Sequence, residues 1–241
     1  MLKLLNTILI GLSTGAIYSL MSISLVLVWR STRVVNFAQA GQAVFSTYIA
    51  YEVSLRTGNF WLALLCAIVS GALLGAFIDF FFMRMLFKHV ASGPIRAIAP
   101  VVATLGLLGI IKSAVGYIWG VEVKPLQPPV STDGISIGSE VVPFSTYDAL
   151  VLLIVFVVLM ILTFIFQRTS LGLSLKASAF SPEISRLSGV RVDLTRTVGW
   201  AIAGACGAIA GVLATPTSLL SPNSLDILLV FGFVAAVIGG L

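Results

Sequence analysis

Long apolar stretches recur along the whole chain, and most are long enough to cross a lipid bilayer. A membrane-spanning helix needs about 20 mostly apolar residues. Such stretches fall at 7–28, 43–55, 61–87, 98–119, 146–166 and 197–215, and a seventh opens at residue 226. With 59% hydrophobic and 10% charged residues, a soluble core cannot bury this surface. We predict an all-α polytopic membrane protein with about seven spans, forming one transmembrane domain over residues 1–241.

The second stretch is short for a crossing and follows a polar run. Residues 36–42 read NFAQAGQ. We expect a broken or re-entrant segment near residues 29–42, because irregular backbone at membrane depth must line protein or a cavity. The seventh stretch ends at residues 239–241, GGL, with no polar flank. We therefore expect that a C-terminal part is missing beyond residue 241.

Basic residues predict how the chain is oriented in the membrane. The side reached after the first, third and fifth spans holds Arg30, Arg33, Arg84, Lys88, Arg96, Arg168, Lys176, Arg186, Arg191 and Arg196. The other side holds only Lys3, Arg56 and Lys124, and Lys112 falls within a span. Because basic loops stay in the cytoplasm, the N-terminus is expected outside, the 168–196 loop inside, and the 120–145 loop outside. The prolines of this outer loop favour a short turn-rich hairpin.

The 168–196 loop contains its own helix signals. Ser181 is a typical N-cap, Pro182 suits the first helical position, Glu183 favours the positive end of the helix dipole, and Gly189 suits a left-handed C-terminal position. The spacing predicts a helix of about two turns. Residues three apart share a helix face, so this helix would present a small apolar surface to a cytoplasmic partner. That surface consists of Ile184 and Leu187, flanked by Arg186.

Small residues at four-residue intervals predict close helix packing. The sixth span carries Gly199, Ala203, Gly207 and Gly211 on one face. The same spacing recurs at Gly11 with Gly15 and at Gly71 with Gly75. Packing within one bundle and a dimer seam both fit this pattern.

Two ionisable residues lie within or near spans, where charges are costly unless they are paired, solvated or at an edge. Asp79 lies close to Arg84 in the sequence, which favours an interfacial ion pair between them. Lys112 either extends to the membrane surface or lines a cavity.

The sequence lacks the usual motifs of enzymes and metal sites. His89 is the only histidine, so no Ser-His-Asp set, HExxH motif or histidine metal cluster can form. No GxxxxGK[ST] loop is present. Cys66 and Cys206 both lie in apolar spans and suggest neither a disulfide nor a metal pair. The basic residues are explained by topology, so no nucleic-acid partner is expected.

Several segments resemble the membrane subunits of ABC importers for branched-chain amino acids, of the LivH type. They are GLSTGAIYSL at 11–20, VNFAQAGQ at 35–42 with YIA at 48–50, ATLGL at 103–107, TSLGLSLKA at 169–177 followed by LSGV at 187–190, and AGACGAIAGVL at 203–213. The chain departs from the family at Lys176, where arginine is usual, and at 180–182. The family's GGLGS stretch and further spans would follow residue 241.

The resemblance implies a transport subunit and not an enzyme, in a bacterial inner membrane. Its implied partners are membrane lipid, a second permease of the LivM type, two cytoplasmic ATPases that use ATP and Mg²⁺, and an external solute-binding protein. No cofactor or metal is expected on this chain. The segment with Pro182, Glu183, Ile184, Arg186, Leu187 and Gly189 would dock on the ATPase.

For the solute path we nominate Asn36, Gln39, Gln42 and Thr104, because a broken polar segment supplies amide and backbone groups beside a cavity. Capping of the second span explains the same residues. Urea, short amides and other small polar solutes are alternative substrates, since related permeases serve them. An ion-coupled secondary transporter and a membrane-embedded scaffold subunit are the competing functions.

Overall fold

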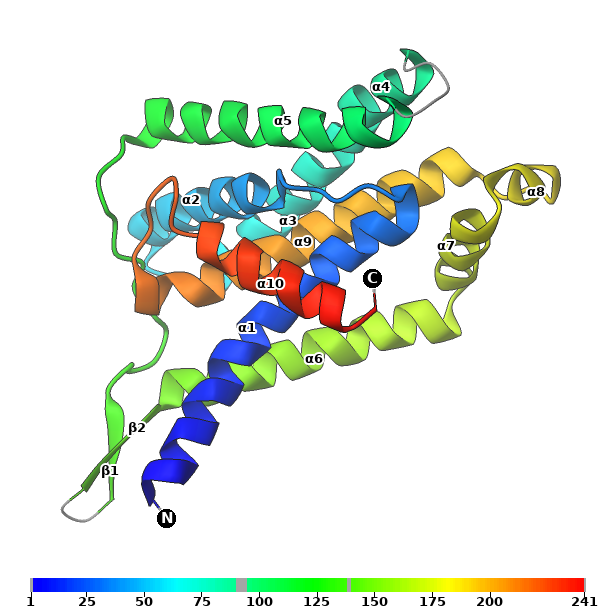
Figure 1. Ribbon diagram of the computed structural model, residues 1–241. Helices are drawn as coiled ribbons and strands as arrows, with labels where there is room; N and C mark the ends of the chain where they lie inside the picture. The colour runs from blue at the N-terminus through cyan, green and yellow to red at the C-terminus, as the bar shows by residue number, and fades with distance from the viewer. Residues whose placement is uncertain (1, 90–94, 138–139, 241) are drawn as a thin grey trace.

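The computed structural model describes residues 2–89, 95–137 and 140–240, and it is a helical bundle with one small hairpin (Figure 1). The bundle opens with α1 (Leu2–Thr32), α2 (Gln39–Thr57) and α3 (Phe60–Phe77). A π-helical turn η1 (Ile78–Met83) and α4 (Arg84–His89) continue α3, and α5 (Ile95–Trp119) follows. After strands β1 (Gly134–Ile137) and β2 (Glu140–Ser145) come α6 (Thr146–Arg168), α7 (Ser170–Phe180), α8 (Pro182–Leu187), α9 (Val192–Ser218) and α10 (Asp226–Ile238).

Five helical segments of the described chain are by themselves long and apolar enough to cross a membrane, so the all-α polytopic fold is confirmed while the count of about seven spans stays a prediction. They are Asn6–Thr32, Phe60–His89, Ile98–Trp119, Thr146–Arg168 and Val192–Ser218. Helix α10 is apolar but short. Helix α2 carries polar side chains such as Gln42, Ser46 and Thr47, which are buried inside the bundle. The chain is a multi-pass membrane protein.

The second crossing is broken, as the sequence predicts. Residues 33–38 between α1 and α2 are not helical. In Figure 1 this segment runs back beside the end of α1 before α2 begins part-way along the bundle. The crossing is therefore part irregular and part helical, and alternate residues of the irregular segment, Val34, Asn36 and Ala38, are buried in the bundle.

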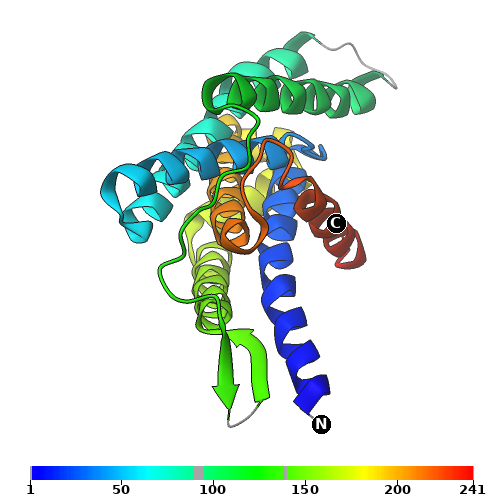
Figure 2. The same cartoon turned by 90° about the vertical axis from the view of Figure 1, so that its left-hand side faces the viewer.

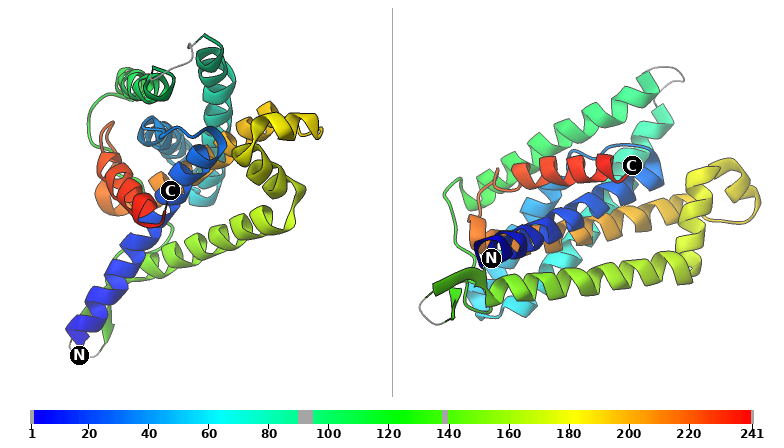
Figure 3. Two further views of the ribbon diagram at one scale, coloured as in Figure 1. Left: turned by 45° about the vertical axis from the view of Figure 1, so that its right-hand side comes forward. Right: turned by 60° about the horizontal axis from the view of Figure 1, so that its bottom comes forward.

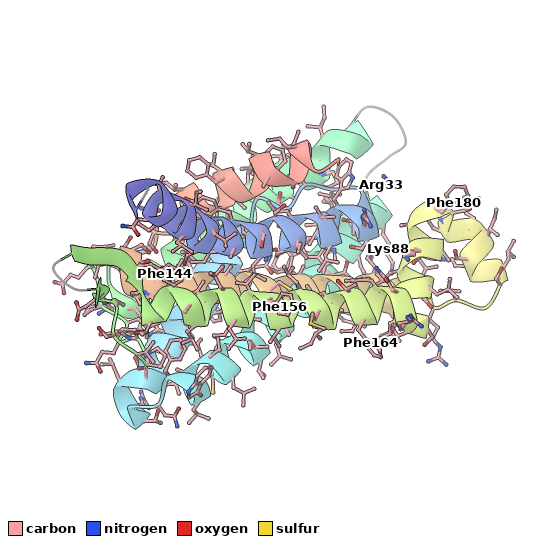
Figure 4. All side chains as sticks on the ribbon, turned by 90° about the horizontal axis from the view of Figure 1, so that it is seen from below. Arg33, Lys88, Phe144, Phe156, Phe164 and Phe180 are labelled. Carbon is pink, nitrogen blue, oxygen red and sulfur yellow. The ribbon has the colours of Figure 1, made fainter. Side chains whose placement is uncertain are left out.

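Helix α9 is the centre of the bundle. It packs against α1, α2 and α3, and 67% of its membrane-spanning window is buried, against 17% for α6. Figure 3 shows α9 enclosed by other helices while α6 lies along one side. In the view from below, Phe156 and Phe164 belong to this outlying helix (Figure 4), and both are exposed.

Glycines set the distance between α3 and α9. A Cβ added to Gly71 would lie 2.6 Å from the carbonyl oxygen of Gly204, and a Cβ on Gly75 would meet the carbonyl oxygen of Trp200. The two backbones are in contact because the glycines on α3 have no side chain that would hold the helices apart. Gly11 and Gly15 on α1 behave differently, since an added Cβ would meet nothing within 4 Å at either position.

The loop at 120–145 forms the predicted hairpin. Strands β1 and β2 pair antiparallel, and Figure 2 shows them projecting beside the N-terminal end of α1. Nearer α5, Lys124 exchanges backbone hydrogen bonds with Leu220 in both directions, each 2.9 Å. This bridge fastens the long loop to the turn between α9 and α10.

Lys112, for which the sequence left a membrane-surface and a cavity position open, forms an ion pair with Asp226. Its Nζ lies 2.6 Å from Oδ1 of Asp226 and 3.1 Å from Oδ1 of Asn223. This pair, which the sequence did not reveal, joins α5 to the start of α10. The partner residues are more than a hundred positions away in the chain.

Candidate functional site

Helix α8 forms where its capping signals predict it. The Ser181 side chain accepts a hydrogen bond from the Ile184 backbone N–H at 3.5 Å, and Pro182 occupies the first turn. Gly189 ends the segment with φ +83°, a left-handed conformation that favours glycine. Glu183 lies in the first turn and Arg186 in the last, so both charges suit the helix dipole.

The apolar residues of α8 face away from the bundle. Ile184 is 63% exposed and Leu187 is 89% exposed. Phe180, at the end of α7, is 91% exposed and lies at the extremity of the molecule in Figure 4. We call these three residues the apolar tip. Exposed apolar patches rimmed by polar residues are a feature of surfaces that meet another protein or a membrane.

The rest of the 168–196 segment is more ordered than the sequence analysis predicts. Helix α7 was missed, although Thr169 caps it by accepting a hydrogen bond from Gly172 N–H at 3.4 Å. Helix α9 begins at Val192 and not at residue 197. Helix α7 packs on α1, α6 and α9 and also contacts α8. Helix α8 is therefore connected to the bundle through α7.

The interaction predicted between Asp79 and Arg84 is not the closest one that Asp79 makes. Arg196 Nε donates to Asp79 Oδ1 at 2.7 Å, and the Thr197 hydroxyl donates to Oδ2 at 2.6 Å. Arg84 Nε lies 3.9 Å from Oδ2. The Asp79 side chain is fully buried, and the predicted pair with Arg84 is present beside the closer pair with Arg196.

The four nominated solute-path residues lie together in the interior. Asn36, Gln39, Gln42 and Thr104 are each 0% exposed. Asn36 Nδ2 donates to Gln39 Oε1 at 3.0 Å, and Gln39 Nε2 donates to the Ala203 carbonyl at 3.0 Å. The Thr104 hydroxyl accepts from the Phe37 backbone N–H at 3.3 Å. These bonds hold the broken segment against α9 and α5.

Gln42 differs from its neighbours. Neither its Nε2 nor its Oε1 has a hydrogen-bond partner among the described residues, and the same is true of Asn36 Oδ1. A buried amide without partners costs roughly 1–3 kcal/mol of stability. Its presence in the core of α2 therefore requires a reason beyond packing.

The small residues that were predicted to form a packing face on α9 lie against this polar cluster. A Cβ on Gly207 would collide with Gln39 Nε2, and one on Gly211 would collide with Thr47 Oγ1. A Cβ on Gly199 would come within 3.3 Å of Ser31 on α1 and Leu175 on α7. The Ala203 carbonyl accepts a second hydrogen bond, from Ser24 Oγ at 2.7 Å. This face of α9 therefore contacts three neighbouring helices, α1, α2 and α7.

A cavity of about 610 Å³ opens at the end of the bundle that carries α7. It lies between the end of α1, the end of α6, and α7, and its basic lining residues are Arg30, Arg33 and Lys176. None of the nominated solute-path residues lines it. In the part of the chain that the structure describes, no group of three or more His, Cys, Asp or Glu side chains could hold a metal ion.

Comparison with known proteins adds an independent finding. The family model described as "Branched-chain amino acid transport system / permease component" matches residues 7–241. A probable branched-chain amino acid transport permease LivH of Methanocaldococcus jannaschii is 30% identical, over 92% of this chain and 70% of that protein. The high-affinity permeases LivH of Salmonella typhimurium and BraD of Pseudomonas aeruginosa are each 22% identical, over 96% of this chain and 77% of each relative. No solved structure matches the chain significantly.

Proposed function

Because the chain belongs to the family of permease components of branched-chain amino acid transport systems, we propose that it is the membrane-spanning permease subunit of an ATP-driven importer. Its substrates are leucine, isoleucine and valine, the class named in its relatives. The observation that carries the proposal is the family match over nearly the whole chain. The exposed apolar tip, which α7 connects to the bundle, gives such a subunit a surface on which an ATPase subunit can dock.

The proposed assembly has several partners. A second permease of the LivM type pairs with this chain in the lipid, an external solute-binding protein delivers the substrate, and two cytoplasmic ATPases use ATP and Mg²⁺. Neither cofactor binds to this chain. Two features support an orientation with α8 in the cytoplasm and the N-terminus outside. Arg33, Lys88 and Phe180 lie toward the same end of the molecule in Figure 4, and the N-terminus lies at the other end in Figure 1.

In this assembly the ATPase docks on Pro182, Glu183, Ile184, Arg186 and Leu187, and Gly189 lets the chain turn away from the docked helix. Closure of the ATPases displaces α8, and α9 carries the displacement into the bundle as a rigid body. The two intramembrane ionisable residues, Asp79 and Lys112, are both paired within the chain, which argues against an ion-coupled mechanism.

Reconstituted transport tests this function. The chain is purified with its co-purifying partners, placed in liposomes with ATP on the side of the ATPases, and supplied with the binding protein and labelled leucine, isoleucine or valine. We expect uptake that requires both ATP and the binding protein. Uptake of urea or acetamide instead would change the substrate class. Uptake driven by an ion gradient without ATP would identify a secondary transporter. No uptake with all partners present would favour the competing function, a membrane-embedded scaffold subunit.

The solute path is proposed to include Asn36, Gln39, Gln42 and Thr104, and Gln42 offers the sharpest test. Because its amide has no partner among the described residues, Gln42→Leu is expected to leave the melting temperature unchanged or raise it. Loss of one hydrogen bond to the solute should lower uptake roughly 2–10-fold.

The matched control for Gln42 is Gln39→Leu. Gln39 donates to Ala203 and accepts from Asn36, so its replacement should lower the melting temperature. Normal uptake by a stable Gln42→Leu variant would remove Gln42 from the path.

A further inference from the structure

The helix that begins as α3 changes its winding around a buried charge. Residues Ile78–Met83 form a π-helical turn between α3 and α4, and Asp79 lies within it with no exposed surface. Single π-helical turns inside α-helices are rare and occur often at functional sites. A buried carboxylate inside a membrane protein is costly and is kept where it serves a function. The two features occur at one residue.

Asp79 holds the start of α9 through both of its oxygens. Arg196 Nε bonds to Oδ1 and the Thr197 hydroxyl bonds to Oδ2. Both partners lie in the second turn of α9. The carboxylate therefore joins the π-helical turn to the end of α9 that lies next to α8.

The same end of α9 is joined to α8. Arg186 Nη2 lies 3.3 Å from Asp193 Oδ1, and the Val190 N–H donates to the Ser185 carbonyl at 2.9 Å. Asp193 also receives a hydrogen bond at its carbonyl from Arg84 Nη2, at 3.0 Å. A continuous set of polar contacts thus runs from α8, through the first turn of α9, to the π-helical turn and α4.

The position of Arg84 allows a second arrangement of the ion pairs in this cluster. It now donates to the Thr197 hydroxyl at 2.8 Å, and its Nε, which is buried without a hydrogen-bond partner among the described residues, lies 3.9 Å from Asp79 Oδ2. Charge-assisted bonds form at about 2.7–2.9 Å. Asp79 and Arg84 lie on one continuous helix, so direct pairing requires the Arg84 side chain to release Thr197 on α9 and to move about 1 Å toward Asp79. One carboxylate faces two arginines and can pair closely with either.

We propose that Asp79 is a positioning residue for energy coupling. By holding Arg196 and Thr197, it makes the π-helical turn of α3 follow α9 when α8 is displaced, and exchange of Arg196 for Arg84 provides the second state. The inference rests on the proposed function, because it concerns transmission from an ATPase docked on α8. It adds a route by which that motion reaches α3.

The test compares Asp79→Asn with the unsubstituted chain in the complete reconstituted transporter. The readout is the ratio of solute molecules imported to ATP molecules hydrolysed. We expect this ratio to fall on the order of 10-fold, because removing one partner of a buried charge pair is among the largest single-residue perturbations. ATP hydrolysis itself should continue, since its active sites lie on the partner subunits.

The matched control is Glu52→Gln, which makes the same carboxylate-to-amide change in an exposed ion pair with Arg56 on α2. It should leave the ratio unchanged, because exposed ion pairs contribute little. If Asp79→Asn does not assemble, Thr197→Val gives the second test. It removes the hydrogen bond that Thr197 donates to Asp79 and the one that it accepts from Arg84, while leaving the Arg196 pair in place, and it should lower the ratio roughly 2–10-fold.

An assembled Asp79→Asn or Thr197→Val transporter with the normal ratio would overturn the inference. Failure of the proposed function would look different, because the unsubstituted transporter itself would then show no ATP-dependent uptake. The double variant Asp79→Asn/Arg196→Gln adds a further check. If the two side chains act as one unit, its ratio should be no lower than that of Asp79→Asn alone, and a much lower ratio would argue against the shared role.

Discussion

Replacement of both Ile184 and Leu187 by aspartate is expected to abolish solute uptake while leaving the subunit folded. Both side chains are exposed, so the changes should alter the free energy of unfolding by no more than about 0.5 kcal/mol each. In a docked complex, however, each aspartate would be buried without a partner, which weakens the free energy of binding by about 2–5 kcal/mol. Uptake in proteoliposomes and co-purification of the ATPase measure the effect, and both should be lost.

The matched control keeps the apolar character of the same positions. Ile184→Val with Leu187→Met should support normal uptake, because volume-conserving apolar changes are tolerated. A Gly189→Val variant tests the geometry instead of the surface, since valine is strained at the φ of +83° found there. It should bind the ATPase but transport poorly. Normal transport by the double aspartate variant would show that the ATPase docks elsewhere.

Alanine at Gly71 and Gly75 is expected to give a large loss of stability. A Cβ at Gly71 would lie 2.6 Å from the Gly204 carbonyl oxygen and 2.8 Å from the Ala208 Cβ, and one at Gly75 would meet the Trp200 carbonyl. Backbone atoms on a central helix cannot move aside easily, so each change should cost roughly 1–3 kcal/mol. The melting temperature of the purified protein in detergent, followed by size-exclusion chromatography, measures this loss.

Alanine at Gly11 and Gly15 provides the comparison. The sequence spacing is identical, but an added Cβ meets nothing within 4 Å on α1. Because alanine favours a helix over glycine by about 1 kcal/mol, these variants should be as stable as the original chain or more stable. Equal destabilisation by the two pairs would mean that the α3–α9 contact is looser than the structure indicates.

The contrast between the two glycine pairs shows what sequence spacing can predict. The four-residue interval identifies helices that are able to approach closely, but the partner depends on the three-dimensional arrangement. Local signals were enough for α8, because Ser181, Pro182 and Gly189 act within their own turn. The apolar stretches located the long helices for the same reason, since each satisfies its own length and composition requirement.

Long-range contacts explain most of the misses. The ion pair that sequence proximity favoured between Asp79 and Arg84 is present, but the closer cation, Arg196, lies 117 positions away and was not found. Lys112 and Asp226 are similarly 114 positions apart. Polar residues made the second span difficult to interpret, because their partners and the glycines that accommodate them lie on α9. The amide cluster itself was found from its polar composition, although the absence of partners at Gln42 required the structure.

The central position of α9 has a consequence for how the protein is made. A ribosome delivers α1, α2 and α3 to the membrane well before α9, so Ser24 and Gln39 arrive without the Ala203 carbonyl to which both later donate, and Asp79 arrives with Arg84 but without Arg196. A buried polar group left without a partner costs roughly 1–3 kcal/mol. The first half of the bundle must therefore stay loosely packed, or keep its polar side chains near water, until α9 enters. In this protein, completion of the core is a late event in synthesis.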